Sequence, residues 1–404
     1  MHEIVNEPRG VRSHGKTSAR ILVCVPRYLP GYKSGGPVRA IANMVASLGE
    51  QLEFFIVTRD RDATDTATYA GVVPNEWCNV GNAQVLYCSS ITFCRLRQAV
   101  RHARPDLIHL NSFQDRFTRS MMILRHFGLL GRTPILLAPR GEFSPGAMEI
   151  KRCKKDLYRT GARWICLHEQ IHWQVSSALE RGHLLAAEPA RRLDSHSIHV
   201  TTEINDGARF SSPHPAKGSG SVRFVFISRI SEKKNLQFLL DLLAKIKGKV
   251  ELDIFGPVAP GDHAYWERCR ASIARLPANI IIRYRGALDH SVVPQVLHEY
   301  HFFTLPTKGE NYCHAAVESF VNGTPAILSN ETPWQRLRES RAGFDIPLED
   351  AKQWIDVLQM CVNMDSTSYS EYSRGALDYS RRFSRHDAVQ QHVEMFKALL
   401  GRSF

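Results

Sequence analysis

Short apolar runs recur along most of the chain, separated by polar or glycine-containing segments. Each run has the length typical of a buried strand, and apolar positions at helical spacing follow many of them. The predicted strands lie at 20–25, 52–58, 85–88, 107–110, 135–138, 222–227, 252–255, 280–284, 302–305 and 326–328. The predicted helices lie at 40–48, 95–103, 236–246 and 315–320, with further helical pattern over 351–396. Strands that alternate with helices predict an α/β protein.

One stretch interrupts this pattern and divides the chain. Residues 205–221 are rich in Gly, Ser and Pro, which is the composition of a linker. We place the linker at 209–221, between predicted domains at 20–208 and 222–384. The first 19 residues are polar and have no apolar core of a secretory signal, so we expect a mobile leader there.

The charge is concentrated in the first half of the chain. The net charge is +12, and residues 1–200 hold 27 Lys+Arg and 17 Asp+Glu. A basic first half could face anionic lipid headgroups, a diphospholipid acceptor or nucleic acid, and simple solubility is the alternative.

The cysteines and the hydropathy exclude several classes of protein. The nine cysteines form no C-x-x-C pair, which argues against a zinc site or a disulfide framework and for a reducing cytoplasm. No run of about 18 apolar residues occurs, so no membrane-spanning helix is predicted.

The candidate chemistry centres on residues 301–330, which have the pattern strand, loop, helix, strand. Glu310 and Glu318 bracket the junction of loop and helix. Eight residues at about 100° each end roughly 80° beyond two turns, which directs Glu318 toward the side of the loop. Such a loop mouth binds ligands in open α/β sheets, and amides at a helix start can hold phosphate. Two acids there suit a sugar nucleotide; the alternative is that both are solvated surface acids.

Two other loops between a strand and a helix are candidates for phosphate binding. The first carries Gly31, Gly35 and Gly36, whose backbone could approach a diphosphate closely, although the loop is not G-x-G-x-x-G. The second carries Arg229 and Lys234, five residues apart, which could form a cationic clamp. Ordinary surface cations are the alternative for the second loop.

Two polar features are given structural interpretations. Asp60 and Asp62 form a bare D-x-D, and since three-residue matches often arise by chance we interpret it as a solvated, charged loop. His109 lies on a predicted strand and is interpreted as packed rather than catalytic.

Several segments resemble a known family. LPTKGENYCHAAVESFVNGTPAILS is similar to the E-x7-E signature of the family 4 glycosyltransferases, retaining enzymes of the GT-B fold. VFISRISEKKNL, LDIFGP, IRYRGAL and ETPW extend the resemblance, which runs from about residue 20 to residue 400. It implies two Rossmann-like domains with a cleft between them. It also implies that a last helix, about 385–404, crosses back to the first domain.

The resemblance implies roles for the polar residues. Arg229 and Lys234 would bind the diphosphate and Glu310 the donor sugar, and these three form the expected catalytic set. Glu318 would bind the ribose diol. The other expected donor-binding residues are Gly35, Gly36, Lys233, Gly256, Asn311, Tyr312 and Cys313. The family usually has glycine at the position of Cys313, whose thiol we interpret as a bystander rather than a nucleophile.

The expected acceptor-side residues are Arg39, Arg140 and Glu142. Arg140 stands where the family usually has a histidine near the reacting sugar. An arginine cannot act as a base, but it can hold a phosphate or carboxylate through two hydrogen bonds. The basic cluster at 151–155 could meet a lipid diphosphate or be a solvated face. Glu180 is expected to have a structural role.

The function that these observations imply is retaining transfer of a sugar from a nucleotide diphosphosugar to a hydroxyl, with no cofactor and no required metal. The expected acceptor is a surface polysaccharide or a lipid-linked oligosaccharide. We expect a cytoplasmic protein with peripheral contact to the inner face of an anionic membrane, and no nucleic-acid partner. The alternatives are another GT-B enzyme, such as a nucleotide-sugar epimerase, and a non-catalytic nucleotide or nucleic-acid binder.

Overall fold

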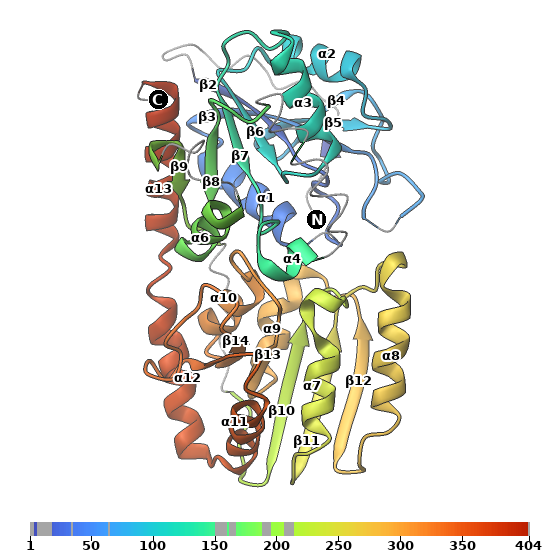
Figure 1. Ribbon diagram of the computed structural model, residues 1–404, viewed down its shortest axis with the longest axis vertical. Coiled ribbons are helices and arrows are strands. Elements are labelled where there is room, and N and C mark those ends of the chain that lie inside the picture. The colour runs from blue at the N-terminus through green and yellow to red at the C-terminus, as the bar shows by residue number, and fades with distance from the viewer. Residues whose placement is uncertain are drawn as a thin grey trace. The chain divides into compact units, whose positions relative to one another are not determined.

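The structure is a computed structural model that describes residues 18–33, 35–63, 65–149, 167–187, 195–205 and 214–402, together with residues 4, 5 and 160. The chain divides into two compact units (Figure 1). The first consists of Met1–Asn205 and Arg385–Phe404, and the second of Asp206–Ser384. Most of the expected leader, the cluster at 151–155 and residues 209–213 of the expected linker lie outside the described residues.

The first unit contains a sheet with the strand order β1-β4-β5-β3-β2-β6-β7-β8-β9. Pairing is parallel from β5 through β9, whereas β4 is antiparallel to both β5 and β1. The strands are β1 (Ile4–Val5), β2 (Ala19–Cys24), β3 (Leu52–Arg59), β4 (Trp77–Val80), β5 (Ala83–Cys88), β6 (Leu107–Asn111), β7 (Ile135–Ala138), β8 (His172–Val175) and β9 (Ile198–Val200).

Both faces of this sheet are covered because its central strands are apolar on both sides. Leu22 and Cys24 of β2 pack in one apolar cluster with residues of α2 and α3, while Ile21 and Val23 pack in another with residues of α1 and α13. The described helices of the unit are α1 (Gly36–Leu48), α2 (Phe93–Ala103), α3 (Arg116–His126), α4 (Pro145–Glu149), α6 (Ala178–Ala187) and α13 (Arg385–Leu400).

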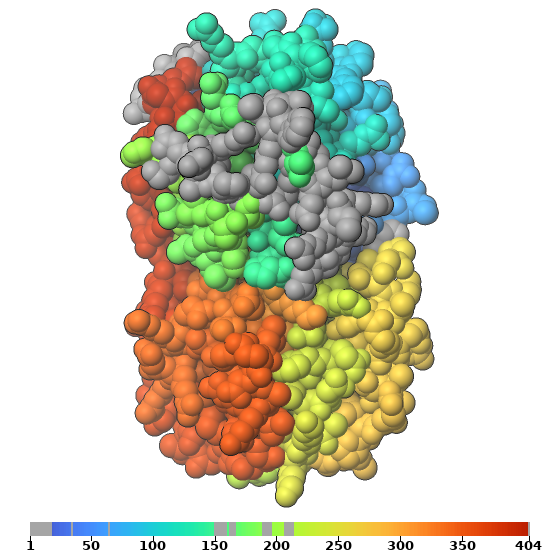
Figure 2. Space-filling model, viewed as in Figure 1, coloured from blue at the N-terminus to red at the C-terminus, as the bar shows by residue number. Residues whose placement is uncertain are grey.

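The second unit contains a fully parallel sheet with the order β12-β11-β10-β13-β14-β15. The strands are β10 (Ser221–Ile227), β11 (Lys249–Phe255), β12 (Ile280–Gly286), β13 (Phe302–Leu305), β14 (Ala326–Ser329) and β15 (Gly343–Ile346). The helices are α7 (Leu236–Leu243), α8 (His263–Ile273), α9 (Val293–His298), α10 (His314–Val321), α11 (Ala351–Asn363) and α12 (Ser366–Ser380). In the view of Figure 1, α7 lies in front of the sheet between β10 and β12, and α8 lies beside β12, while Figure 2 shows side chains over the same region.

Every strand and helix predicted from apolar runs is present, with ends that differ by a few residues. The pattern does not predict the strands β1, β4, β8, β9 and β15 or the helices α3, α4, α6, α8 and α9. The described end of the expected linker packs on the second unit rather than standing free. Buried Lys217 donates hydrogen bonds to the carbonyls of Val362 and Met364 at the end of α11, at 3.1 and 2.7 Å.

Candidate functional site

A buried ion pair joins two loops at the carboxyl ends of adjacent strands in the second unit. Lys234 ends the turn after β10, and its ammonium donates to Oε1 of Glu310 in the loop after β13. Thr307 donates to the same oxygen at 3.0 Å. The loops are also tied through their backbones, because the amide of Lys308 donates to the carbonyl of Lys233 at 2.8 Å.

Glu310 is 8% exposed and is therefore not a solvated surface acid. Burial by itself raises the pKa of this carboxyl, but the charges of Lys234 and Lys233 and the hydrogen bonds outweigh that effect and lower the pKa below its ordinary value. Glu310 is consequently ionised at neutral pH, as an acceptor of hydroxyl hydrogen bonds must be.

Glu318 lies on α10 and is 7% exposed. Its Oε1 is 3.1 Å from Nε2 of His290, which begins a short turn after β12. Besides burial, the charges of both Glu310 and Glu318 raise the pKa of the Cys313 thiol, which lies between them in the sequence.

Cys313 occupies the turn into α10 with φ of 66°, in the left-handed region that favours glycine. The glycine expected from the family resemblance therefore has a backbone reason, and Cys313 is an exception to it. Burial raises the pKa of the thiol far above its ordinary value, so the thiol is protonated and is not an activated nucleophile. Tyr312, just before it, is buried with its ring 5.2 Å from that of Trp334.

Arg229 and Gly256 lie where β10 and β11 end. Arg229 is exposed and makes no hydrogen bond or ion pair with a described residue, so its guanidinium is available to a ligand. Gly256 has φ of 146°, and a Cβ there would lie 1.8 Å from the carbonyl oxygen of Ser228. A glycine is therefore required at position 256 because the backbone of Ser228 passes close to it.

The exposed end of the next strand, β12, carries two side chains with partners inside the unit. Arg283 donates to Glu251 at 2.9 Å and to Asp253 at 3.1 Å. The Tyr284 ring lies 4.6 Å from that of Trp266, and its hydroxyl donates to the Gly256 carbonyl. Both side chains are engaged within the unit.

In the first unit, the glycine loop leads into α1. Gly35 has φ of 67° and precedes the helix, Gly36 is its first residue, and Arg39 follows in its first turn. The interpretation of Asp60 and Asp62 as solvated is wrong, since they are 1% and 3% exposed. Asp62 accepts hydrogen bonds from the amides of Tyr32 and Lys33 at 2.8 and 3.0 Å, so it holds the glycine loop in place.

Arg140 and Glu142 are committed to partners inside the first unit. The Arg140 side chain donates to Oδ1 of Asn111 at 2.8 and 3.0 Å and forms an ion pair with buried Glu203. Glu142 accepts from the Ser112 hydroxyl and, at 2.9 Å, from the Gln114 amide. Three of the five guanidinium N–H groups of Arg140 are therefore used to organise the ends of β6 and β9.

Glu180 and His109 have the structural roles that the sequence predicts. Glu180 accepts from the amides of Gly141 and Ser176 at 2.5 and 2.8 Å, and it is 2% exposed. His109 is fully buried on β6, and burial lowers its pKa well below the ordinary value, so the ring is neutral.

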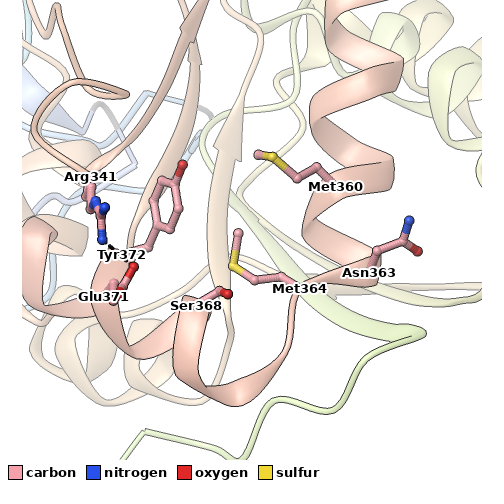
Figure 3. Close-up of a pocket in the computed structure, with 7 residues that line it drawn as sticks. All are labelled: Arg341, Met360, Asn363, Met364, Ser368, Glu371 and Tyr372. Atoms are coloured by element: carbon pink, nitrogen blue, oxygen red, sulfur yellow. Dashed lines mark hydrogen bonds and ion pairs between the residues drawn. The ribbon is translucent and has the colours of Figure 1, made fainter.

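Two cavities in the second unit lie away from the acidic pair. One, of about 360 Å³, lies along α11 and α12, with the Arg341–Glu371 ion pair at its edge (Figure 3). None of the residues that line it is a predicted site residue. Among the described residues, no three or more His, Cys, Asp and Glu side chains gather closely enough to hold a metal ion. In that same part of the chain no helix is long and apolar enough to span a membrane.

Comparisons with known proteins agree with this architecture. Residues 221–363 match the model of the glycosyl transferases group 1, and residues 35–193 match that of the glycosyl transferase 4-like domain. HepE of Anabaena, crystallised with UDP and glucose, is similar over 94% of this chain and 100% of its own, with a TM-score of 0.70 and 14% identity. Sucrose-phosphate synthase of Thermosynechococcus elongatus is similar over 95% and 100%, with a TM-score of 0.74 and 15% identity.

One curated relative also matches, over part of its length. It is an uncharacterized 41.2 kDa protein in the cps region of Klebsiella pneumoniae, 21% identical over 182 residues, which are 44% of this chain and 46% of that protein. The match spans about half the length of that relative.

Two parallel-sheet α/β units with these structural neighbours have the GT-B fold, which confirms the fold class expected from the sequence. Within that class, the chain belongs to the family 4 type of glycosyltransferases.

Proposed function

We propose that this glycosyltransferase transfers a sugar from a nucleotide diphosphosugar to a hydroxyl acceptor with retention of anomeric configuration and without a required metal or other cofactor. The observation that carries the proposal is the ion pair of Lys234 with buried Glu310 at the carboxyl ends of β10 and β13, the edge at which open α/β sheets bind ligands. The Anabaena neighbour crystallised with UDP and glucose supports a nucleotide sugar as the donor.

In this proposal the cations of the second unit stabilise the leaving group. Lys234 and Arg229, with Lys233 beside them, neutralise the charge that develops on the departing nucleoside diphosphate, and amides around Asn311 and Cys313 assist them. Glu310 positions the donor sugar, while Glu318, oriented by His290, accepts hydrogen bonds from the ribose hydroxyls. Since the pKa of Glu310 is lowered, this carboxylate is a weak base. The departing phosphate then takes the proton of the acceptor hydroxyl. That hydroxyl attacks the sugar carbon on the face from which the phosphate departs, so the anomeric configuration is retained.

The test compares two lysines of the same two loops. Lys234→Ala removes the buried ammonium, and we expect turnover to fall by about 10²–10³. Lys308→Ala removes an equal charge, but the Lys308 side chain is exposed and the hydrogen bond of this residue to Lys233 is made by its backbone amide, which the substitution keeps. Turnover should therefore stay within about twofold of that of the unaltered protein. Equal activity of the two variants would refute the assignment of Lys234. Analysis of the anomeric linkage in the product tests retention, and turnover after treatment with EDTA tests metal independence.

We also propose that the acceptor belongs to surface polysaccharide or lipid-linked oligosaccharide synthesis and that the protein works at the inner face of an anionic membrane. The relative in a cps region supports the first part. The second part is supported by the stretch after α3, where Phe127 is 71% exposed, Leu129 is 43% exposed and Arg132 is exposed. Flotation with liposomes tests it. Binding should require anionic lipid, weaken with salt and weaken in Phe127→Ser, and a failure to bind at low salt contradicts it.

A further inference from the structure

Two arginines of the first unit that the proposed donor chemistry does not use lie at the carboxyl ends of neighbouring strands. In the parallel pair β2–β3, Cys24 stands beside Val57, and the amide of Val25 donates to the Val57 carbonyl at 3.1 Å. Arg27 follows two residues after Val25, and Arg59 follows two residues after Val57. Because parallel strands end at the same edge, both guanidinium groups come to the ligand-binding edge of the first sheet.

The hydrogen-bond donors of these arginines are only partly satisfied. Arg27 donates from Nη1 to the carbonyl of Pro26 at 2.7 Å, but its Nε is buried and has no hydrogen-bond partner among the described residues. Arg59 has one long contact, 3.4 Å from Nη2 to Oδ2 of Asp115. Burial lowers the pKa of Arg27, and the charge of Arg59 lowers it further.

The nearby acids accept hydrogen bonds from other groups, and one of them, Asp115, also contacts Arg59. Asp60 pairs with Arg61 at 2.9 Å. Asp62 is held by the amides of the glycine loop, and Oδ1 of Asp115 accepts from the amide of Phe117 at the start of α3, at 2.8 Å. Arg27 makes no ion pair with any described residue, so this edge has donors in excess.

A third donor lies beside them. The Tyr69 hydroxyl is buried and has no hydrogen-bond partner within the described part of the chain. It lies against the glycine loop, since a Cβ at Gly31 would be 2.2 Å from it. Burial raises the pKa of Tyr69, so the group is a neutral O–H donor, and the Arg27 charge acts directly on it.

We propose that Arg27, Arg59 and Tyr69 bind a phosphoryl group of the acceptor substrate. This inference rests on the proposed function and names the acceptor class, a phosphorylated or lipid-diphosphate-linked sugar. One guanidinium group can donate two hydrogen bonds to a planar carboxylate and leave it without need of further donors. A tetrahedral phosphoryl group has three oxygens, which can accept hydrogen bonds from donors on three separate segments. The donor diphosphate has its own cations in the second unit, so the first-unit donors serve the other substrate.

Calorimetric titration of the full chain tests the site without knowledge of the acceptor. The parent protein carries Arg229→Ala and Lys234→Ala, which removes the phosphate ligands of the second unit, and the probe is inorganic pyrophosphate. Adding Arg27→Gln or Arg59→Gln should weaken binding at least tenfold, and Tyr69→Phe several-fold. Arg97→Gln, which removes an equal charge from an exposed position on α2, is the matched control and should change binding less than twofold. Acetate should bind at least tenfold more weakly than phosphate.

Pyrophosphate affinity that is unchanged in Arg27→Gln, or lost equally in Arg97→Gln, overturns the proposal, and so does acetate that binds as well as phosphate. If Arg27→Gln does not fold, Arg27→Lys keeps the charge but not the fork, and it should still lose several-fold in affinity. Dodecyl phosphate compared with inorganic phosphate distinguishes a lipid-linked source from a soluble one. Nucleotide binding by the otherwise unaltered Arg27→Gln protein should match that of the unaltered chain. If the unaltered chain bound no nucleoside diphosphate, the proposed function would be wrong. The pyrophosphate titration would still test whether Arg27, Arg59 and Tyr69 bind a phosphoryl group.

Discussion

Asp62 offers a direct way to loosen the glycine loop without touching a group that meets substrate. Its carboxylate is 3% exposed and accepts from the amides of Tyr32 and Lys33 at 2.8 and 3.0 Å. A hydrogen bond to a charged group contributes about 1.5–3 kcal/mol, and amides in an exposed loop can turn to water when the acceptor is lost. We therefore expect Asp62→Ala to reduce the free energy of local opening by about 2–3 kcal/mol.

That change corresponds to amide exchange about 30- to 150-fold faster in the loop. The assay is hydrogen–deuterium exchange with mass spectrometry on a peptide that covers residues 26–36. Asp65→Ala is the matched control, because Asp65 contacts the same loop through the Lys33 ammonium, at 2.5 Å. A surface pair of this kind contributes about 0–1 kcal/mol, so exchange should change little. Equal exchange in the two variants, or unchanged exchange in Asp62→Ala, would refute the reasoning.

Two further predictions concern the second unit. Gly256→Ala should lower the free energy of unfolding by more than about 4 kcal/mol, because its Cβ would meet the Ser228 carbonyl, whereas Gly286→Ala, with φ of 77° and open space around it, should cost about 1–2 kcal/mol. Urea unfolding measures both, and similar losses would contradict the role of the close approach. Burial lowers the pKa of His214 and of His301 to about 4 from 6.5. The unfolded chain binds these protons first, so stability should fall as pH drops from about 6.5 to 4, by roughly 2–3 kcal/mol for each histidine. Unfolding midpoints between pH 7 and 5 should show a shallower slope in His301→Gln, and an unchanged slope would sink this prediction.

The elements that the sequence predicts well are those whose apolar pattern is strong. β7 and β13 appear at the predicted bounds because every residue in them is buried, so the strands read as unbroken apolar runs. β4 is missed because this short antiparallel strand at the side of the sheet is only half-buried and its residues are mixed. Helix α3 is missed because four of its residues are charged or histidine, although its inner face is apolar.

The candidate site is predictable in part for a similar reason. Glu310 and Glu318 sit at a local junction whose geometry follows from helical spacing, so the sequence places both. Asp62 and Arg140 were beyond such reasoning, because their partners lie 29 or more residues away and are set by strand order rather than by spacing. The pair Arg27 and Arg59 gives no signal in the sequence either, since only the register of β2 with β3 brings them together.

The return of α13 to the first unit has a consequence for how the protein is made. Val393 and Phe396 of this helix share an apolar cluster with Ile21 and Ile41, near the other end of the chain. During synthesis, that cluster stays incomplete until the last helix has left the ribosome, by which time the whole of the second unit has already emerged. The second unit can therefore reach its native state first, and a nascent first unit exposes apolar surface to chaperones for the entire interval.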